Sequence, residues 1–294
     1  MSSGSKGSTT LHGLLWISPW IVGFVLFMLA PMGVSLYYSL TDYSLLEPPI
    51  SIGLDNYREL ASDEVFWITV RNTGLYALFS VTFGMILTIG LAVMLSGKRR
   101  GVGLVRAVVF LPTLVPLVAA ALAWTWMYNG EVGMINTLLA RIGIDGPNWL
   151  GDRRWAMSAL IMMSLWQVGG AVVICLAALQ DVPHSLYQAV SIDGAGPLRR
   201  FWHVTLPMIS PAVLFNVIIA IIWSLQVFAV PYIMTKGGPE DATRFYTQYL
   251  YENAFVYGRM GYASAMAWIQ LLVVLVLTGI TIRLSRRFVH YRVA

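Results

Sequence analysis

The chain has 294 residues, of which 57% are hydrophobic and only 11% are charged. Because about a quarter of the residues in soluble domains are charged, this composition excludes an ordinary soluble protein and favours a membrane protein. The net charge of +5 is divided among small basic clusters between apolar runs, which argues against a nucleic-acid-binding face.

The first apolar run lies at 14–40, after a small, polar segment at 1–12 that we interpret as a flexible cytoplasmic tail. Lys6 precedes the run, as in a signal peptide. The run is too long for the apolar part of a signal peptide, which has about 7–15 residues, so we expect a retained spanning helix. Pro19 and Pro31 are expected to kink this helix, which a helical bundle tolerates.

Five further apolar runs follow, each long enough for the roughly 20 residues that a spanning helix needs. The predicted fold class is therefore an all-α, polytopic membrane protein with six transmembrane helices. The six runs lie at 14–40, 72–96, 104–128, 155–180, 208–234 and 262–284.

The charge distribution predicts the orientation of these helices. Cytoplasmic loops carry an excess of Lys and Arg, and this rule is satisfied when both termini are cytoplasmic. All acidic residues except Asp181 and Asp193 then lie in outer segments. The basic residues of the cytoplasmic segments are Lys6, Lys98, Arg99, Arg100, Arg106, Arg199, Arg200, Arg283, Arg286, Arg287 and Arg292.

None of the loops is long enough to form a catalytic domain. This topology divides the chain into four parts. The parts are the tail at 1–12, the first transmembrane helix with an acidic outer loop at 13–67, a core of five transmembrane helices at 68–286 with a cytoplasmic loop at 181–207, and a cytoplasmic tail at 287–294.

No catalytic motif is present in the sequence. A phosphate-binding loop of the form G-x-x-x-x-G-K-[ST] is missing, so we do not expect this chain to hydrolyse ATP by that route. The four histidines lack metal-ligand spacing, and the single cysteine, Cys175, is interpreted as a small buried residue. The runs contain no obvious Asp, Glu or Lys at mid-depth, which argues against an ion-coupled secondary carrier, the alternative function.

The loop at 181–207, which we call the elbow, has its own local pattern. Asp181 is placed to cap a short helix that begins near Pro183 and ends at about Ile192. The residues at 193–197 predict a turn, because two of them are glycines and one is a proline. A second amphipathic segment is expected to lead into the fifth span; its basic residues are Arg199, Arg200 and His203.

The elbow resembles the signature E-A-A-x-x-x-G-x(9)-I-x-L-P of bacterial ABC import permeases. Gln188, Val190 and Val204 replace the Glu, the second Ala and the Ile of that signature. The strings I-D-G-A-G at 192–196 and T-L-P at 205–207 are typical of the carbohydrate-uptake branch. Other segments are similar to maltose-type and glycerol-phosphate-type subunits; they lie at 18–45, 53–57, 71–73, 237–239, 251–255 and 261–265.

The resemblance implies a type I ABC importer permease fold, a multi-pass location in the cell inner membrane and transport by alternating access. The implied partners, besides the lipid bilayer, are a second homologous permease subunit, two ABC ATPase subunits and an extracytoplasmic solute-binding protein. ATP and Mg are then bound by the ATPase subunits, and no cofactor is expected in this chain. The solute is expected to be of the carbohydrate type, with disaccharide, oligosaccharide, polyol and glycerol phosphate as open alternatives.

The same resemblance implies that the elbow helix sits in a groove on the ATPase. Ala189 and Gly194 are small enough for close contact there, and Asp193 is either a helix cap or a polar contact. The alternative is an ordinary loop that needs Gly and Pro only to turn. The predicted coupling residues are Tyr187, Gln188, Ala189, Asp193, Gly194, Ala195, Gly196 and Pro207.

Polar and aromatic residues within the spans are candidates for a solute path, because sugar hydroxyls need hydrogen-bond partners and aromatic rings suit sugar faces. The alternative is that these side chains join helices or belong to the aromatic belt at the membrane surface. The candidates are Gln167, Asn216, Trp223, Gln226 and Tyr232.

Overall fold

The computed structural model describes residues 6–97, 100–287 and 289. Most of the C-terminal tail predicted at 287–294, and Lys98, Arg99 and Arg292 of the predicted cytoplasmic set, lie outside the described residues. The first helix, α1 (Lys6–Phe24), begins inside the predicted N-terminal tail, whose first five residues are also outside the described part of the chain.

The regular secondary structure of the described residues is helical apart from one short hairpin, which confirms the predicted fold class. Four of its helical segments are long and apolar enough to cross a membrane, and two bent helix pairs bring the number to six when each pair counts as one span. The four unbroken segments are Leu15–Ser39, Glu64–Leu95, Pro197–Leu225 and Met260–Ser285.

The chain forms two compact units, of which the first comprises Met1–Asp63 and Leu250–Leu271. Its first span changes from α-helix to a π-helical turn just before Pro31, which then occupies the first turn of the next helix. The elements of this unit are α1 (Lys6–Phe24), a π turn (Val25–Leu29), α2 (Ala30–Ser39), β1 (Thr41–Asp42), β2 (Ile50–Ser51), α3 (Asp55–Ser62), a π turn (Glu252–Val256) and the first part of α15 (Met260–Ser285).

Polar contacts join the end of the first span to α3 within this unit. The Asn56 amide donates to the carbonyl oxygens of Ser39 and Thr41, each at 2.9 Å. Glu59 of α3 receives two 2.6 Å hydrogen bonds from Arg259, which precedes α15. The loop between the first span and α3 is therefore held to the start of α15.

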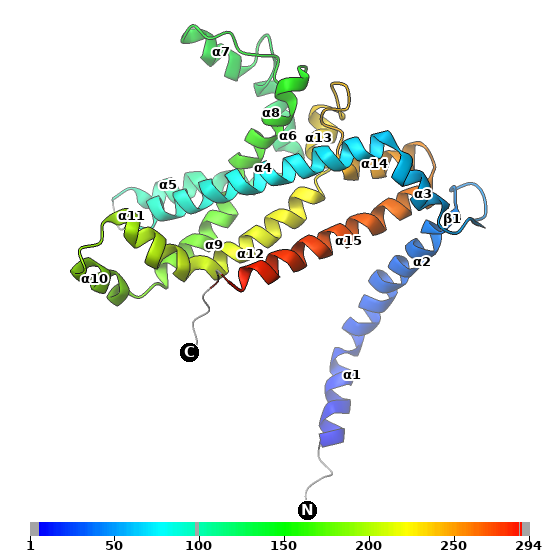
Figure 1. Cartoon of the computed structure of the whole chain (residues 1–294), viewed down its shortest axis with the longest axis horizontal. Helices are drawn as coiled ribbons and strands as arrows, with labels where there is room; N and C mark the ends of the chain where they lie inside the picture. The colour runs from blue at the N-terminus through cyan, green and yellow to red at the C-terminus, as the bar shows by residue number, and fades with distance from the viewer. Residues whose placement is uncertain (1–5, 98–99, 288, 290–294) are drawn as a thin grey trace, which may run out of the picture. The chain divides into compact units, whose positions relative to one another are not determined.

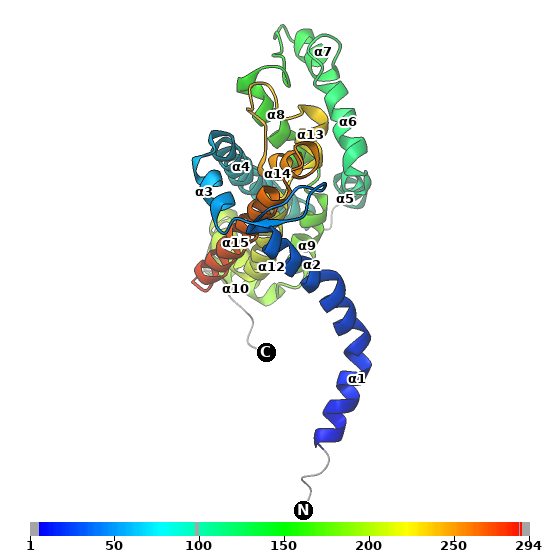
Figure 2. The same cartoon turned by 90° about the vertical axis from the view of Figure 1, so that its right-hand side faces the viewer.

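The second unit comprises Glu64–Tyr249 and Leu272–Ala294. Its helices α4, α9 and α12 pack side by side, while α7 and α10 lie at opposite ends of the unit (Figures 1 and 2). The elements are α4 (Glu64–Leu95), α5 (Val102–Phe110), a 3-10 turn (Leu111–Leu114), α6 (Leu117–Met127), α7 (Met134–Arg141), α8 (Arg153–Trp166), α9 (Gly169–Gln180), α10 (His184–Ile192), α11 (Pro197–Arg200), a π turn (Phe201–Thr205), α12 (Leu206–Leu225), α13 (Ala229–Met234) and α14 (Tyr246–Tyr251).

Two predicted spans are not single straight helices. The run at 104–128 bends by 101° between Val102–Leu114 and Leu117–Met127, where Pro116 is the extended N-cap residue of α6. Proline disfavours helical geometry in the residue before it, which explains this break. The run at 155–180 bends by 46° between α8 and α9.

The fifth span differs from its predicted bounds at both ends. We expected it at 208–234, but the helical segment begins at Pro197 and ends at Leu225. It begins earlier because α11, the π turn and α12 follow one another without a break. It ends earlier because the chain leaves helical geometry at Gln226 and resumes only in the short helix α13.

Two apolar clusters form the core of the second unit. One is centred on α6, α8 and α13 and contains Tyr128, Leu160 and Phe245. The other lies between α4, α9 and α12 and contains Ala92 and Cys175, both completely buried. The prediction that Cys175 is a small buried residue is confirmed.

Candidate functional site: a cavity and an exposed elbow

A cavity of about 620 Å³ lies among α4, α6, α8, α9, α12 and the segment after α12. All the described residues that line it are uncharged, and most are apolar. Its polar or amphipathic lining residues are Tyr76, Ser80, Thr88, Ser164, Gln167, Asn216, Trp223, Ser224 and Gln226. This arrangement brings hydroxyl groups, amides and aromatic rings to the surface of the cavity.

Four of the five predicted solute-path residues line this cavity: Gln167, Asn216, Trp223 and Gln226. Tyr232 does not line it. The Tyr232 ring instead stacks on that of Phe228, with ring centroids 5.1 Å apart, and Phe228 is itself a lining residue.

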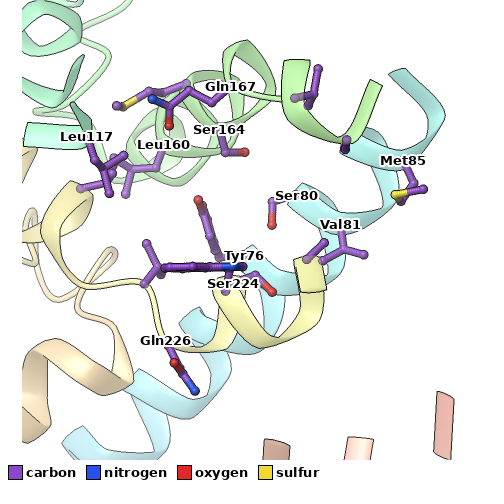
Figure 3. A pocket seen from close by; sticks show the side chains of 18 of the residues that line it. Tyr76, Ser80, Val81, Met85, Leu117, Leu160, Ser164, Gln167, Ser224 and Gln226 are labelled. Carbon is purple, nitrogen blue, oxygen red and sulfur yellow. The ribbon is translucent and has the colours of Figure 1, made fainter. Parts of the chain in front are cut away.

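The two lining glutamines occupy helix ends. Gln167 is the C-cap residue of α8 and Gln226 is the C-cap residue of α12. Figure 3 shows their side chains on opposite sides of the cavity. Each amide is thus placed where the backbone leaves helical geometry, and each brings donors and an acceptor to the lining.

Asn216 serves both as a lining residue and as a contact between helices. Its side chain is only 5% exposed. The Asn216 amide donates to the carbonyl oxygen of Ala171 and to the Cys175 sulfur, each at 3.3 Å. It therefore joins α12 to α9 at the cavity wall, as the helix-joining interpretation expects, and it also lines the cavity.

Sequence reasoning missed a row of small or polar residues on α4. Tyr76, Ser80, Gly84 and Thr88 all line the cavity and follow one another at intervals of four. Side chains at this spacing lie on one face of a helix. The four-residue spacing of these residues therefore indicated this wall of the cavity, although we did not predict it.

Serine hydroxyls on two other helices complete the polar lining and were also not predicted. Ser164 donates to the Ile161 carbonyl at 2.6 Å, and Ser224 donates to the Ile221 carbonyl at 3.0 Å. Each hydroxyl keeps oxygen lone pairs that can accept from a solute. In Figure 3 the side chains of Tyr76, Ser80 and Ser164 extend toward the same space.

The elbow presents one face of α10 to the surroundings and packs the other against the chain. Gln188 and Ala189 are exposed. Tyr187 and Val190 pack against the cluster between α4, α9 and α12. Of the predicted coupling residues, Tyr187 is thus the one on the packed face of α10.

Gly194 ends α10 in a Schellman motif. Its φ of +69° lies in the left-handed region, which costs other L-residues about 1–2 kcal/mol. The Gly194 amide donates to Ser191 and the Ala195 amide donates to Val190, at 3.1 and 3.2 Å. The predicted turn is confirmed, and the backbone conformation explains the glycine without reference to a partner.

The caps of α10 differ in part from the expectation. Pro183, rather than Asp181, occupies the N-cap position of α10, and Asp181 is the C-cap residue of α9. Asp193 is the C-cap residue of α10. The chain then turns through the extended Gly196, the N-cap of α11, and Pro207 lies in the first turn of α12.

Comparison with known proteins identifies the kind of chain that carries these features. Residues 65–290 match the family described as binding-protein-dependent transport system inner membrane component. The probable ABC transporter permease protein YesP of Bacillus subtilis is 39% identical, covering 98% of this chain and 95% of that protein. The sulfoquinovosyl glycerol transport system permease protein SmoG of Agrobacterium fabrum is 32% identical, covering 94% and 91%.

A solved structure has the same fold. A chain in the crystal structure of a bacterial alginate ABC transporter, in complex with an alginate pentasaccharide-bound periplasmic protein, superposes with a TM-score of 0.83. Its sequence is 25% identical, and the match covers 96% of each chain.

Proposed function

Because this chain belongs to the family of inner-membrane components of binding-protein-dependent transport systems, we propose that its cavity forms part of a carbohydrate path through the membrane. The chain is a multi-pass permease subunit of an ABC importer, and ATP is hydrolysed in partner subunits. The importer also includes a solute-binding protein.

One observation carries the proposal: a single helical segment joins the elbow to the cavity. The segment runs from Pro197 to Leu225 without interruption. Thr205, near its start, packs in the elbow, and Asn216 and Ser224 line the cavity further along. A displacement of the elbow is thereby transmitted to the cavity wall as a rigid-body movement.

The chemistry of the lining supports a carbohydrate solute. Sugars present many hydroxyl groups, and buried polar groups require hydrogen-bond partners. Ser80, Ser164 and Gln167 provide such partners, and the exposed ring of Trp223 provides an apolar surface for a sugar face. The relatives whose names or titles mention a sulfoquinovosyl glycerol and an alginate pentasaccharide support the same solute class.

The exposed face of α10 is the proposed docking element for an ATPase subunit. Gln188, Ala189 and Asp193 lie on its accessible surface. We further propose that the complete importer contains a second homologous permease subunit and two ATPase subunits. ATP-driven closure of the ATPase pair then moves α10 and reorients the helices around the cavity.

Both termini are proposed to be cytoplasmic. The elbow must face the cytoplasm to reach an ATPase, and its Arg199 and Arg200 fit the excess of basic residues on that side of the membrane. We also propose that residues 68–286 form the permease core.

Reconstitution tests the function directly. Proteoliposomes that contain this chain, the second permease and the ATPase subunits, with the binding protein outside, are loaded with ATP and Mg and supplied with tritium-labelled maltose, lactose and raffinose. We expect uptake of at least one of these saccharides that requires enclosed ATP. Uptake driven by a proton or sodium gradient without ATP would support the ion-coupled carrier instead, and absence of uptake of all three with ATP present would contradict a neutral di- or trisaccharide as the solute.

A further inference from the structure

We propose that Tyr187 is a positioning residue whose hydroxyl pairs with that of Thr205 and locks α10 to the cavity-lining helix, so that movement of α10 moves α12 with it. The two hydroxyl oxygens are 3.2 Å apart. The inference rests on the proposed docking of α10 on an ATPase, but it assigns Tyr187 to the inside of the elbow rather than to the docking surface.

The packing of α10 separates these two tasks by face. Tyr187 and Val190, three residues apart, face the apolar cluster that contains Val204 and Ile209. Gln188 and Ala189 are exposed. A partner that docks on the exposed face therefore does not reach the Tyr187 hydroxyl, which is directed back at its own chain.

Thr205 is placed by the π turn that precedes α12. The turn covers Phe201–Thr205, and Thr205 is only 7% exposed. Its hydroxyl also contacts the carbonyl oxygen of Arg200, at 3.5 Å. Since a carbonyl only accepts, Thr205 donates to Arg200 and is left to accept from Tyr187. The resulting chain of polar contacts links α10 to the last residue of the π turn and to Arg200, the residue before the turn.

No other described side chain of α10 forms a hydrogen bond with a different element. The Ser191 hydroxyl bonds within the helix, to the Tyr187 carbonyl at 2.6 Å. Beyond α10 the chain passes through Gly194 and Gly196, where no described atom lies within 4 Å of the place that a β-carbon would take. Without the Tyr187–Thr205 pair, only apolar packing and this glycine-containing turn would fix the angle between α10 and α12.

Replacement of either hydroxyl tests the Tyr187–Thr205 contact in the reconstituted importer. The measurement is the amount of tritium-labelled saccharide imported per ATP hydrolysed, using the mixture of maltose, lactose and raffinose. We expect Tyr187→Phe and Thr205→Val each to lower this ratio about five-fold, the fold-change equivalent to about 1 kcal/mol. Thr205→Ser, which keeps the hydroxyl, should restore the ratio, and the double variant should be no worse than either single one.

Co-purification of the ATPase subunits separates positioning from docking. The amount of ATPase bound should not change in Tyr187→Phe or Thr205→Val, whereas Ala189→Arg on the exposed face should reduce it. An unchanged import ratio in Tyr187→Phe would overturn the inference, and so would loss of bound ATPase in that variant. If Ala189→Arg retains the ATPase, the proposed docking face is wrong, independently of the result at Tyr187.

Discussion

The α-carbon of Gly169 lies directly against the backbone of Val109, where α9 crosses α5. A β-carbon at Gly169 would overlap the Val109 carbonyl oxygen and would lie 2.9 Å from the α-carbon of Phe110. These atoms belong to the backbone and cannot rotate away. Glycine at this position therefore allows the two helices to touch beside the break between α8 and α9.

Gly169→Ala should destabilise the protein, and its neighbour provides a matched control. We expect a loss of about 1–3 kcal/mol, the usual cost of overpacking, seen as a lower midpoint in thermal unfolding of the detergent-purified protein. Gly170→Ala should have little effect, because no described atom lies within 4 Å of a β-carbon there. Equal midpoints for the two variants would show that the helix crossing is looser than the structure indicates.

A similar close contact joins α15 to the first hairpin within the first unit. A β-carbon at Gly261 would overlap the Thr41 carbonyl oxygen, and the Gly261 amide donates to the Tyr43 carbonyl at 3.1 Å. Gly261→Ala should lower the unfolding midpoint and increase proteolysis of the loop at 42–50. The control is Gly279→Ala in the same helix, where no described atom lies within 4 Å of a β-carbon. If only Gly279→Ala lost stability, the close contact assigned to Gly261 would be refuted.

The helical architecture followed from the sequence because apolar runs of sufficient length have few alternatives in a membrane. The run at 14–40 corresponds closely to Leu15–Ser39, and that at 262–284 to Met260–Ser285. The bends within the runs at 104–128 and 155–180 were not predicted, because periodicity and hydropathy do not reveal a bend. Pro116 was the available signal for one break, and the pair Gly169-Gly170 was the signal for the other.

The candidate site was predictable only where a residue is unusual for a span. Gln167, Asn216 and Gln226 were found because amides are rare in apolar runs. The serines of the cavity were not found, since a serine inside a helix usually bonds its own backbone, as Ser164 does. Contacts such as that between Tyr187 and Thr205 join residues 18 positions apart and depend on a turn and a π turn that hydropathy does not reveal.

Asn72 should be required for the ordered loop before α14. Its amide donates to the carbonyl oxygens of Asp241 and Arg244, at 2.7 and 3.1 Å. Asn72→Asp keeps the shape but replaces the donor by a carboxylate, so we expect a loss of about 1–3 kcal/mol. Thermal unfolding checks this, with Arg71→Gln at the exposed neighbouring position as control; an unchanged midpoint in Asn72→Asp would contradict it.

Gly194 should tolerate asparagine better than valine. Its positive φ is unfavourable for a β-branched residue, whereas asparagine adopts this conformation more readily. We expect Gly194→Val to insert normally but to lower ATP-dependent saccharide uptake, with Gly194→Asn intermediate. Gly196→Ala should transport normally, because Gly196 has an extended backbone; equal uptake for Gly194→Val and the unmodified importer would contradict the role of the turn.

Reaction of a thiol introduced at Ser80 tests most directly whether the cavity carries the solute. In a Cys175→Ser background, Ser80→Cys places the thiol on the cavity wall, and Thr82→Cys places one on the same helix at an exposed position that does not line the cavity. Proteoliposomes of the complete importer are treated with N-ethylmaleimide, with and without the saccharide mixture during ATP-driven turnover. We expect that modification of Ser80→Cys blocks uptake, that transported saccharide slows the modification, and that Thr82→Cys shows neither effect. Complete modification of Ser80→Cys with undiminished uptake would contradict it.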